Sequence, residues 1–211
     1  MAQFNQGVLG AFSGKVGSVV GSNWRDIDYM RGLPKQSSKP ATAKQLLIRE
    51  KFRLLIQFLT LVKSVINQGF KNEDTRRATA FNLAFTANKD AFAGTDTEPV
   101  LDFSKMIFSK GSGVSKATGC KIVADGDGVL TVTWDAISGN AQALTDEATV
   151  VLYCEEDKEV VVHEGVLRSL NTAQVEIPSN WSSCTIHGYV YMTSKEDKNS
   201  LTSYAGALSI M

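Results

Sequence analysis

The chain has 211 residues, 43% of them hydrophobic, and its formal net charge is zero. This composition excludes an intrinsically disordered chain, and no apolar run is long enough and free enough of charge to predict a membrane-spanning helix. Residues 1–110 carry 16 Lys/Arg against 9 Asp/Glu, whereas residues 111–211 carry 6 against 13, so the halves have net charges of +7 and −7. Such asymmetry is typical of modules with different partners or of copies that attract head to tail, although two solvated surfaces can also differ by chance.

Residues 1–40 form a glycine-rich arm, with glycines at positions 7, 10, 14, 17, 21 and 32. Glycine destabilises a helix interior but suits tight or closely packed extended chain. Two short strands are predicted at 16–24 and 29–31, joined by a polar turn at 25–28. We therefore expect an extended arm that contains a β-hairpin.

Residues 41–94 are predicted to form a helical hairpin. Thr42 is a suitable N-cap, and residues 43–68 contain neither Gly nor Pro until Gly69 provides a stop. The polar residues of this long helix lie on one narrow stripe, so its apolar arc is wider than the roughly 100° that a surface helix needs. A second helix at 75–93 covers part of that arc. The rest must be covered by the arm, by the C-terminal half or by another subunit.

Residues 95–117 are expected to be a linker with a strand at 106–108, and residues 118–211 a β domain. Leu130, Val132 and Trp134 alternate with threonines, which predicts a half-buried strand. About seven short strands in this length are typical of a β-sandwich. The predicted fold class is therefore α+β, a hairpin arm and a helical hairpin followed by an immunoglobulin-like sandwich, with its other strands at 149–154, 159–166, 173–177, 184–193 and 200–208.

The sequence offers little catalytic or metal-binding chemistry. The segment 10–15 (GAFSGK) differs from a phosphate-binding loop, because three residues rather than four separate its glycines and a valine follows the lysine. His163 and His187 are expected at surface or half-buried strand positions. A metal site that combines them with Cys154 and Cys184 would need four strands to converge, so the thiols are expected to be reduced and buried. No catalytic residue, metal or cofactor is predicted.

Several segments resemble known proteins. Residues 129–135 resemble the second strand of a fibronectin type III domain, and residues 189–204 resemble its final hairpin. Nearly the whole chain resembles an uncharacterised family of Bacteroidota and phage-encoded proteins, for which no activity is implied. Residues 40–45 and the helix that follows are also similar to small structural proteins of tailed phages. The family resemblance rests on GAFSGKVGSVVG at 10–21, Trp24, Arg31, Pro34, PATAKQ at 40–45, Arg49, Phe52 and SYAG at 203–206.

Together these features predict a non-enzymatic structural or assembly protein. The resemblance implies a phage or prophage virion component of the tail, neck or capsid surface. It would be made in the bacterial cytoplasm and would bind itself and other virion proteins, without a membrane partner. A surface-binding adhesin module is a weaker reading of the β domain. The expected assembly interface is apolar: Phe12, Val16, Val19, Val20, Trp24, Tyr29, Phe52, Leu55, Phe58 and Leu59.

The alternative is a nucleic-acid-binding accessory protein of a mobile element. Residues 1–77 carry 13 Lys/Arg against 5 Asp/Glu, with aromatic residues interleaved. Such a segment can bind phosphates, with an affinity that falls steeply as salt rises. The expected contacts are basic residues of the arm and helices: Lys15, Arg25, Arg31, Arg49, Arg53, Arg76 and Arg77.

Overall fold

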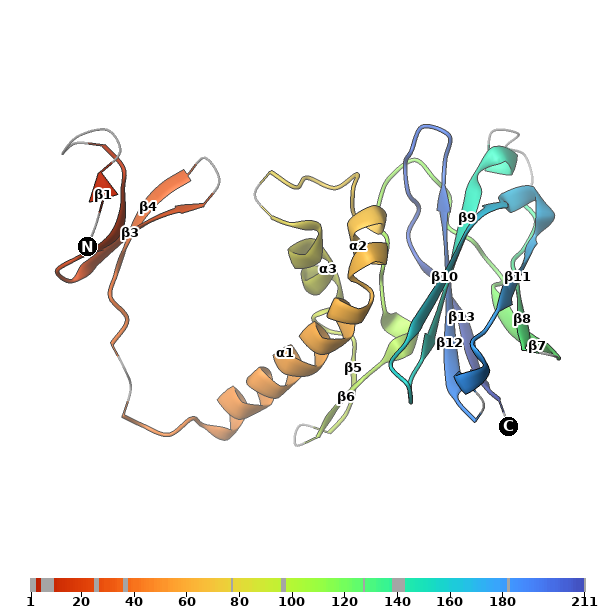
Figure 1. Cartoon of the computed structure of the whole chain (residues 1–211), viewed down its shortest axis with the longest axis horizontal. Coiled ribbons are helices and arrows are strands. Elements are labelled where there is room, and N and C mark those ends of the chain that lie inside the picture. Colours follow the sequence, from red (N-terminus) through yellow and green to blue (C-terminus); the bar gives the residue numbers. More distant parts are fainter. Residues whose placement is uncertain are drawn as a thin grey trace. The chain divides into compact units, whose positions relative to one another are not determined.

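The computed structural model describes residues 3–4, 10–24, 27–35, 38–76, 78–95, 98–126, 128–137, 143–181 and 183–210 (Figure 1). The chain divides into two compact units, the arm unit (Met1–Thr42) and the main unit (Ala43–Met211). Among the described residues, no helix is both long enough and apolar enough to cross a membrane.

The arm unit is an antiparallel meander in the order β1-β2-β3-β4. Its last two strands correspond to the predicted hairpin, but the predicted turn at 25–28 is shorter because residues 27 and 28 already belong to β4. The sequence did not predict β2 as a separate strand. The glycine at its centre, Gly14, has a φ of 111° and weakens the strand pattern. The strands are β1 (Gln3–Phe4), β2 (Phe12–Val16), β3 (Val19–Trp24) and β4 (Ile27–Gly32).

The main unit begins with the helices α1 (Ala43–Leu61), α2 (Lys63–Gly69) and α3 (Ala80–Asn88). The predicted long helix is interrupted at Val62, whose ψ of 18° is not helical, and it ends as predicted at Gly69. A Cβ at Gly69 would lie 2.1 Å from the Phe108 carbonyl oxygen, so this close approach requires glycine. The second helix is shorter than the predicted 75–93, because it begins after Thr79, whose hydroxyl accepts the backbone N–H of Asn82.

Two expectations for the following segment are wrong. Irregular chain was expected after residue 94, but β5 (Phe92–Gly94) pairs with β6 (Pro99–Leu101) in a short hairpin. Residues 106–108 form no strand. The side-chain amide of Asn88 forms the backbone hydrogen bonds that a neighbouring strand would otherwise form. It donates to the Ile107 carbonyl oxygen at 2.8 Å and accepts the Ile107 N–H at 2.7 Å.

Besides the β5-β6 hairpin, the described strands of the main unit form two antiparallel sheets, in the orders β10-β9-β12-β13 and β11-β8-β7. The strands predicted between residues 118 and 211 are all present, with ends that differ by a few residues. The strands are β7 (Lys121–Gly126), β8 (Val129–Thr133), β9 (Glu147–Cys154), β10 (Val160–Leu167), β11 (Thr172–Glu176), β12 (Thr185–Thr193) and β13 (Ser203–Ser209). Short 3-10 turns are η1 (Phe103–Lys105), η2 (Ala143–Thr145), η3 (Arg168–Leu170) and η4 (Ser179–Trp181).

The four-stranded sheet is covered on both faces. One face, with Leu152 and Ile186, shares a core with the three-stranded sheet. The other face, with Tyr153, Tyr189 and Tyr191, shares a second core with the helices. This explains why β9 and β12 are buried along almost their whole length instead of alternating between core and solvent. The unit therefore combines helices with antiparallel sheets, which is the predicted α+β class.

Candidate functional site

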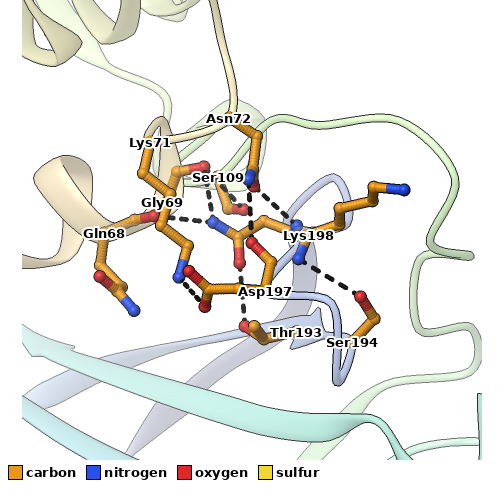
Figure 2. A network of polar contacts seen from close by, with 10 residues as sticks. Gln68, Gly69, Lys71, Asn72, Ser109, Thr193, Ser194, Asp197 and Lys198 are labelled. Atoms are coloured by element: carbon orange, nitrogen blue, oxygen red, sulfur yellow. Dashed lines mark hydrogen bonds and ion pairs between the residues drawn. The ribbon is translucent and has the colours of Figure 1, made fainter.

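A cluster of polar contacts around the buried Asn199 fixes the helices to the four-stranded sheet. Figure 2 labels four of its partners, Gln68, Gly69, Asn72 and Thr193. The Asn199 amide donates to the carbonyl oxygens of Gln68 at 2.7 Å and Gly69 at 3.2 Å, which cap the end of α2. Its backbone N–H donates to the Asn72 side chain at 2.9 Å, and its amide oxygen accepts the Thr193 hydroxyl at 2.9 Å. These contacts bind the carbonyl oxygens at the end of α2 and hold that end of the helix against the sheet, which is a structural role.

The first half of α1 exposes an apolar surface within the main unit. No side chain of residues 43–52 is buried, and Leu46, Ile48 and Phe52 are 55%, 65% and 54% exposed. Ile48 and Phe52 are one helical turn apart and so share one face. Phe52 also contacts the ring of Phe85 on α3, with centroids 5.1 Å apart. The unit therefore covers the second half of the helix and leaves the first half open.

Three residues expected at an assembly interface lie instead in the core of their own unit. Leu55, Phe58 and Leu59 are at most 3% exposed and pack with the aromatic face of the four-stranded sheet. The Phe58 ring meets Tyr153 edge-on at 5.0 Å. The expected interface at these three residues is therefore wrong, because this part of the helix is covered by α3 and by the C-terminal half, which is one of the three covers expected for the wide apolar arc. Phe52 alone of the four named helix residues remains exposed.

The arm sheet carries apolar residues on both of its faces. Cross-strand pairs place Val20, Trp24 and Tyr29 on one face together with Ile27. Val16, Trp24 and Tyr29 are 44–47% exposed, Val19 and Val20 are half-buried, and every residue of β4 is exposed. The opposite face carries Phe12, whose ring lies over Gly21 so closely that a Cβ there would meet it at 2.6 Å. Among the described residues, neither core cluster includes a residue of this unit.

The candidate nucleic-acid contacts fall into separate groups. Lys15 and Arg31 pair with Val20 from either side and so lie on the same face as Trp24 and Tyr29. Arg49 is exposed on α1. Arg25 and Arg77 lie outside the described residues.

Two of the candidate arginines already bind carboxylates. Arg53 donates to both Glu50 oxygens, at 3.0 and 2.5 Å, and this hydrogen bond lowers the pKa of Glu50. Arg76 donates in the same way to Asp74, at 3.0 and 3.1 Å. Their guanidinium groups would have to exchange these partners for phosphate, which makes them weaker candidates than Lys15 and Arg31.

His187 is more buried than expected, at 7% exposure. Its Nδ1 lies 2.9 Å from the Tyr204 hydroxyl, and its ring stacks against Phe103 at 4.5 Å. Burial lowers the pKa of His187, and Glu155, whose carboxylate is 3.5 Å from Nε2, offsets part of this effect. We find no nucleophile among these contacts, so the arrangement indicates a packed core histidine. His163 is half-buried on β10.

Two of the three cysteines lie together at one end of the four-stranded sheet. All three cysteines are free thiols. Cys154 lies at the end of β9 and Cys184 just before β12, and both approach Asp157. The two sulfur atoms and one Asp157 carboxylate oxygen lie within 4.8 Å of one another. The Cys184 thiol lies 3.8 Å from the Asp157 carboxylate. Its hydrogen bond with Cys154, together with burial, raises the pKa of Cys184 to about 12.

Neither histidine can join this group. Along β12 and β9, His187 pairs with Tyr153, whereas Cys154 pairs with Ile186, so the imidazole and the thiol lie on opposite faces of the sheet. His163 pairs with Val150, four residues before Cys154, which is about 13 Å along the strand. The four residues therefore do not come together in the structure. Sequence spacing alone could not find the set with Asp157, because it depends on the pairing of β9 with β12.

Comparisons with known proteins identify a family without an assigned function. No curated protein sequence matches the chain. A solved structure described as "Myokine structure" is similar over 46% of this chain and 98% of its own, with 10% identity and a TM-score of 0.38, which is too low to support an argument. The model of the family described as "Family of unknown function (DUF6266)" matches residues 11–206. The chain therefore belongs to the DUF6266 family of unknown function.

Proposed function

We propose that this protein is a non-enzymatic structural protein that self-associates through its arm unit and the first half of α1. The observation that carries the proposal is the exposed apolar surface of α1, with Ile48 at 65% and Phe52 at 54% exposure in a unit that otherwise has two well-packed cores. Contiguous apolar surface of this kind is typical of a protein–protein interface. A second copy of the chain is the favoured partner, because the charge beside this surface is opposite to the charge of another segment that every copy carries.

The charge argument uses two local segments of the main unit. Residues 43–53 carry four Lys/Arg and one Glu, whereas the turn at 155–159 carries four Asp/Glu and one Lys. The apolar surface of α1 is thus bordered by net positive charge, and every copy also presents a net negative turn. Opposite charges on different surfaces favour a head-to-tail contact, which closes into a ring or continues as a lattice.

The β part of the main unit fits this role as a fibronectin type III-like module of the immunoglobulin-like class. Its support is the strand order, with the first, second and fifth strands in one sheet and the third, fourth, sixth and seventh in the other. Buried Trp134 follows β8, the second of these strands. Such domains are recurrent binding and spacing modules, but the fold alone assigns no partner.

We place the protein in the virion of a phage or prophage, in the tail, neck or capsid surface, after synthesis in the bacterial cytoplasm. This step rests on the resemblance of residues 10–21 to a family of Bacteroidota and phage-encoded proteins, and of residues 40–45 to tailed-phage structural proteins. Other virion proteins are then further partners. Copurification with capsid or tail proteins from induced particles tests the location separately from self-association.

Self-association is tested by light scattering coupled to size exclusion over a range of concentrations. We expect the full chain to form an oligomer and Ile48→Glu to weaken association by about 10-fold or more, because the substitution places a charge in an apolar contact. Leu170→Glu is the matched control: Leu170 is 60% exposed in the same unit but on η3, and its substitution should leave association unchanged. A wild-type chain that stays monomeric at all concentrations contradicts the proposal, as does an Ile48→Glu variant that associates normally.

A second candidate function is binding of single-stranded nucleic acid by the arm unit. It is favoured by one observation: Lys15, Arg31, Trp24 and Tyr29 share one face of the arm sheet. Basic and aromatic side chains on one face bind phosphates and stack bases without sequence preference.

Fluorescence anisotropy with a labelled oligonucleotide tests this second function at low and at physiological salt. Binding that weakens with salt and is lost in Lys15→Glu/Arg31→Glu supports it. Arg53→Glu, in the main unit, is the control and should bind as the wild type does. The absence of a signal at low salt excludes this candidate.

A further inference from the structure

We propose that Cys154, Cys184 and Asp157 form a binding site for a thiophilic divalent cation of the zinc type. The three side chains offer two sulfur atoms and one carboxylate oxygen, all within 4.8 Å of one another. A tetrahedral zinc ion with bonds of about 2.3 Å to sulfur holds its two sulfur ligands roughly 3.8 Å apart. Side-chain movements of about 1 Å would therefore close the three donors around one ion.

The backbone brings these donors together from three places in the sequence. β9 and β12 are antiparallel neighbours, so the end of β9 at Cys154 lies beside the start of β12 at Thr185, which follows Cys184. The turn between β9 and β10 folds back over this end and carries Asp157. A hydrogen bond of 3.0 Å from the Cys154 N–H to the Glu159 carbonyl oxygen closes the turn. The site thus lies at the end of two paired strands, with Cys154 on β9, Cys184 directly before β12 and Asp157 in the turn.

Neighbouring groups orient the proposed ligands. The Asp157 N–H donates to the Cys154 sulfur at 3.4 Å, and the Asn180 amide donates to the Asp157 carboxylate at 3.2 Å. The Glu156 carboxylate lies 3.8 Å from the Cys154 sulfur and accepts the Thr185 N–H at 2.8 Å. One of its oxygen atoms can therefore supply the fourth ligand of the ion. Metal sites in proteins depend on such supporting hydrogen bonds, which fix the ligands in direction.

Charge also favours a cation at this position. Four of the five residues at 155–159 are acidic. Both sulfur atoms belong to nearly inaccessible residues, with Cys154 at 0% and Cys184 at 4% exposure, so the ion would be shielded from water on the side of the core. Binding would release the two thiol protons to solvent. The complex of the ion with two thiolates and one carboxylate would carry a charge of −1.

Titration of the reduced full chain with Co²⁺, which replaces zinc as a spectroscopic probe, tests the site. We expect the sulfur-to-cobalt charge-transfer absorption and the visible bands of a tetrahedral ion at one equivalent, and their loss on addition of Zn²⁺. Cys154→Ser and Cys184→Ser should abolish the charge-transfer band from the substituted ligand and weaken binding at least 10-fold. Cys120→Ser, which removes the third thiol, should titrate as the wild type does.

Two variants keep the test independent of core packing. Asp157→Asn changes an exposed residue, and Asn180→Ala, also at an exposed position, removes the supporting hydrogen bond to Asp157 together with one to Glu159. Both should keep the circular dichroism spectrum of the wild type and weaken Co²⁺ binding about 10-fold or more. A reduced wild-type chain without thiolate–cobalt absorption overturns the proposal. It is also overturned if Cys120→Ser alone removes that absorption, or if Asp157→Asn binds as tightly as the wild type.

Discussion

His187 lies in the core between the helices and the four-stranded sheet, and its two ring nitrogens have different surroundings. Nδ1 is 2.9 Å from the Tyr204 hydroxyl, whereas Nε2 is buried and forms no hydrogen bond among the described residues, with Glu155 at 3.5 Å. Protonation would place a charge beside Phe103 in this core, and Glu155, which is half exposed, compensates only in part. The folded protein therefore favours neutral imidazole.

A pH-dependent stability follows from the lowered pKa of His187. The unfolded chain binds a proton near the ordinary histidine pKa of about 6.5, while the folded chain binds it only at lower pH. Below about pH 6.5 the unfolded state holds more protons, so the free energy of unfolding should fall as pH drops toward the folded-state pKa. Urea unfolding between about pH 7.5 and 5 measures this. His187→Asn should flatten that part of the profile. A His187→Asn profile as steep as that of the wild type contradicts the assignment.

At the scale of elements, local sequence patterns predicted the strands and the ends of the long helix. The alternation of Leu130, Val132 and Trp134 follows from one face of β8 being buried, and all three residues are at most 4% exposed. Gly69 marks a helix end because the chain there meets Phe108 too closely for a side chain. These features depend on residues near each other in sequence, where spacing carries the information.

Elements that depend on distant contacts could not be predicted in the same way. The segment at 106–108 has the composition of a strand, yet it is held by the side chain of Asn88, 19 residues earlier. The α1 core residues pack against Tyr153 and its neighbours on β9 and β12, which no spacing within the helix reveals. The dithiol group at Cys154 and Cys184 likewise requires the pairing of two strands 30 residues apart. The sequence thus showed which residues are chemically suited to a candidate surface, but it could not show which of them are buried.

At the scale of the whole molecule, the main unit joins its helices to its sheets by one apolar core and one polar cluster. Asn199 is fully buried at their junction and contacts both α2 and β12. Its partners Gln68, Gly69 and Thr193 are labelled in Figure 2. The second core contains residues of both the helices and the four-stranded sheet. The helices and the sheets should therefore unfold together in the wild type, which coincident transitions by two probes would show.

Asn199→Ala should weaken that junction. The substitution removes three hydrogen bonds of the fully buried Asn199 side chain, those to the Gln68 and Gly69 carbonyl oxygens and the one from the Thr193 hydroxyl, so we expect a loss of about 2–4 kcal/mol in the free energy of unfolding. The loss should affect the helices first, because the β core around Trp134 and Trp181 keeps its own packing. Circular dichroism, which follows the helices, should then show an earlier urea transition than tryptophan fluorescence. Asn67→Ala, at an exposed position of α2, serves as the control and should keep both transitions together. Unchanged stability in Asn199→Ala would mean that the apolar core alone joins the layers.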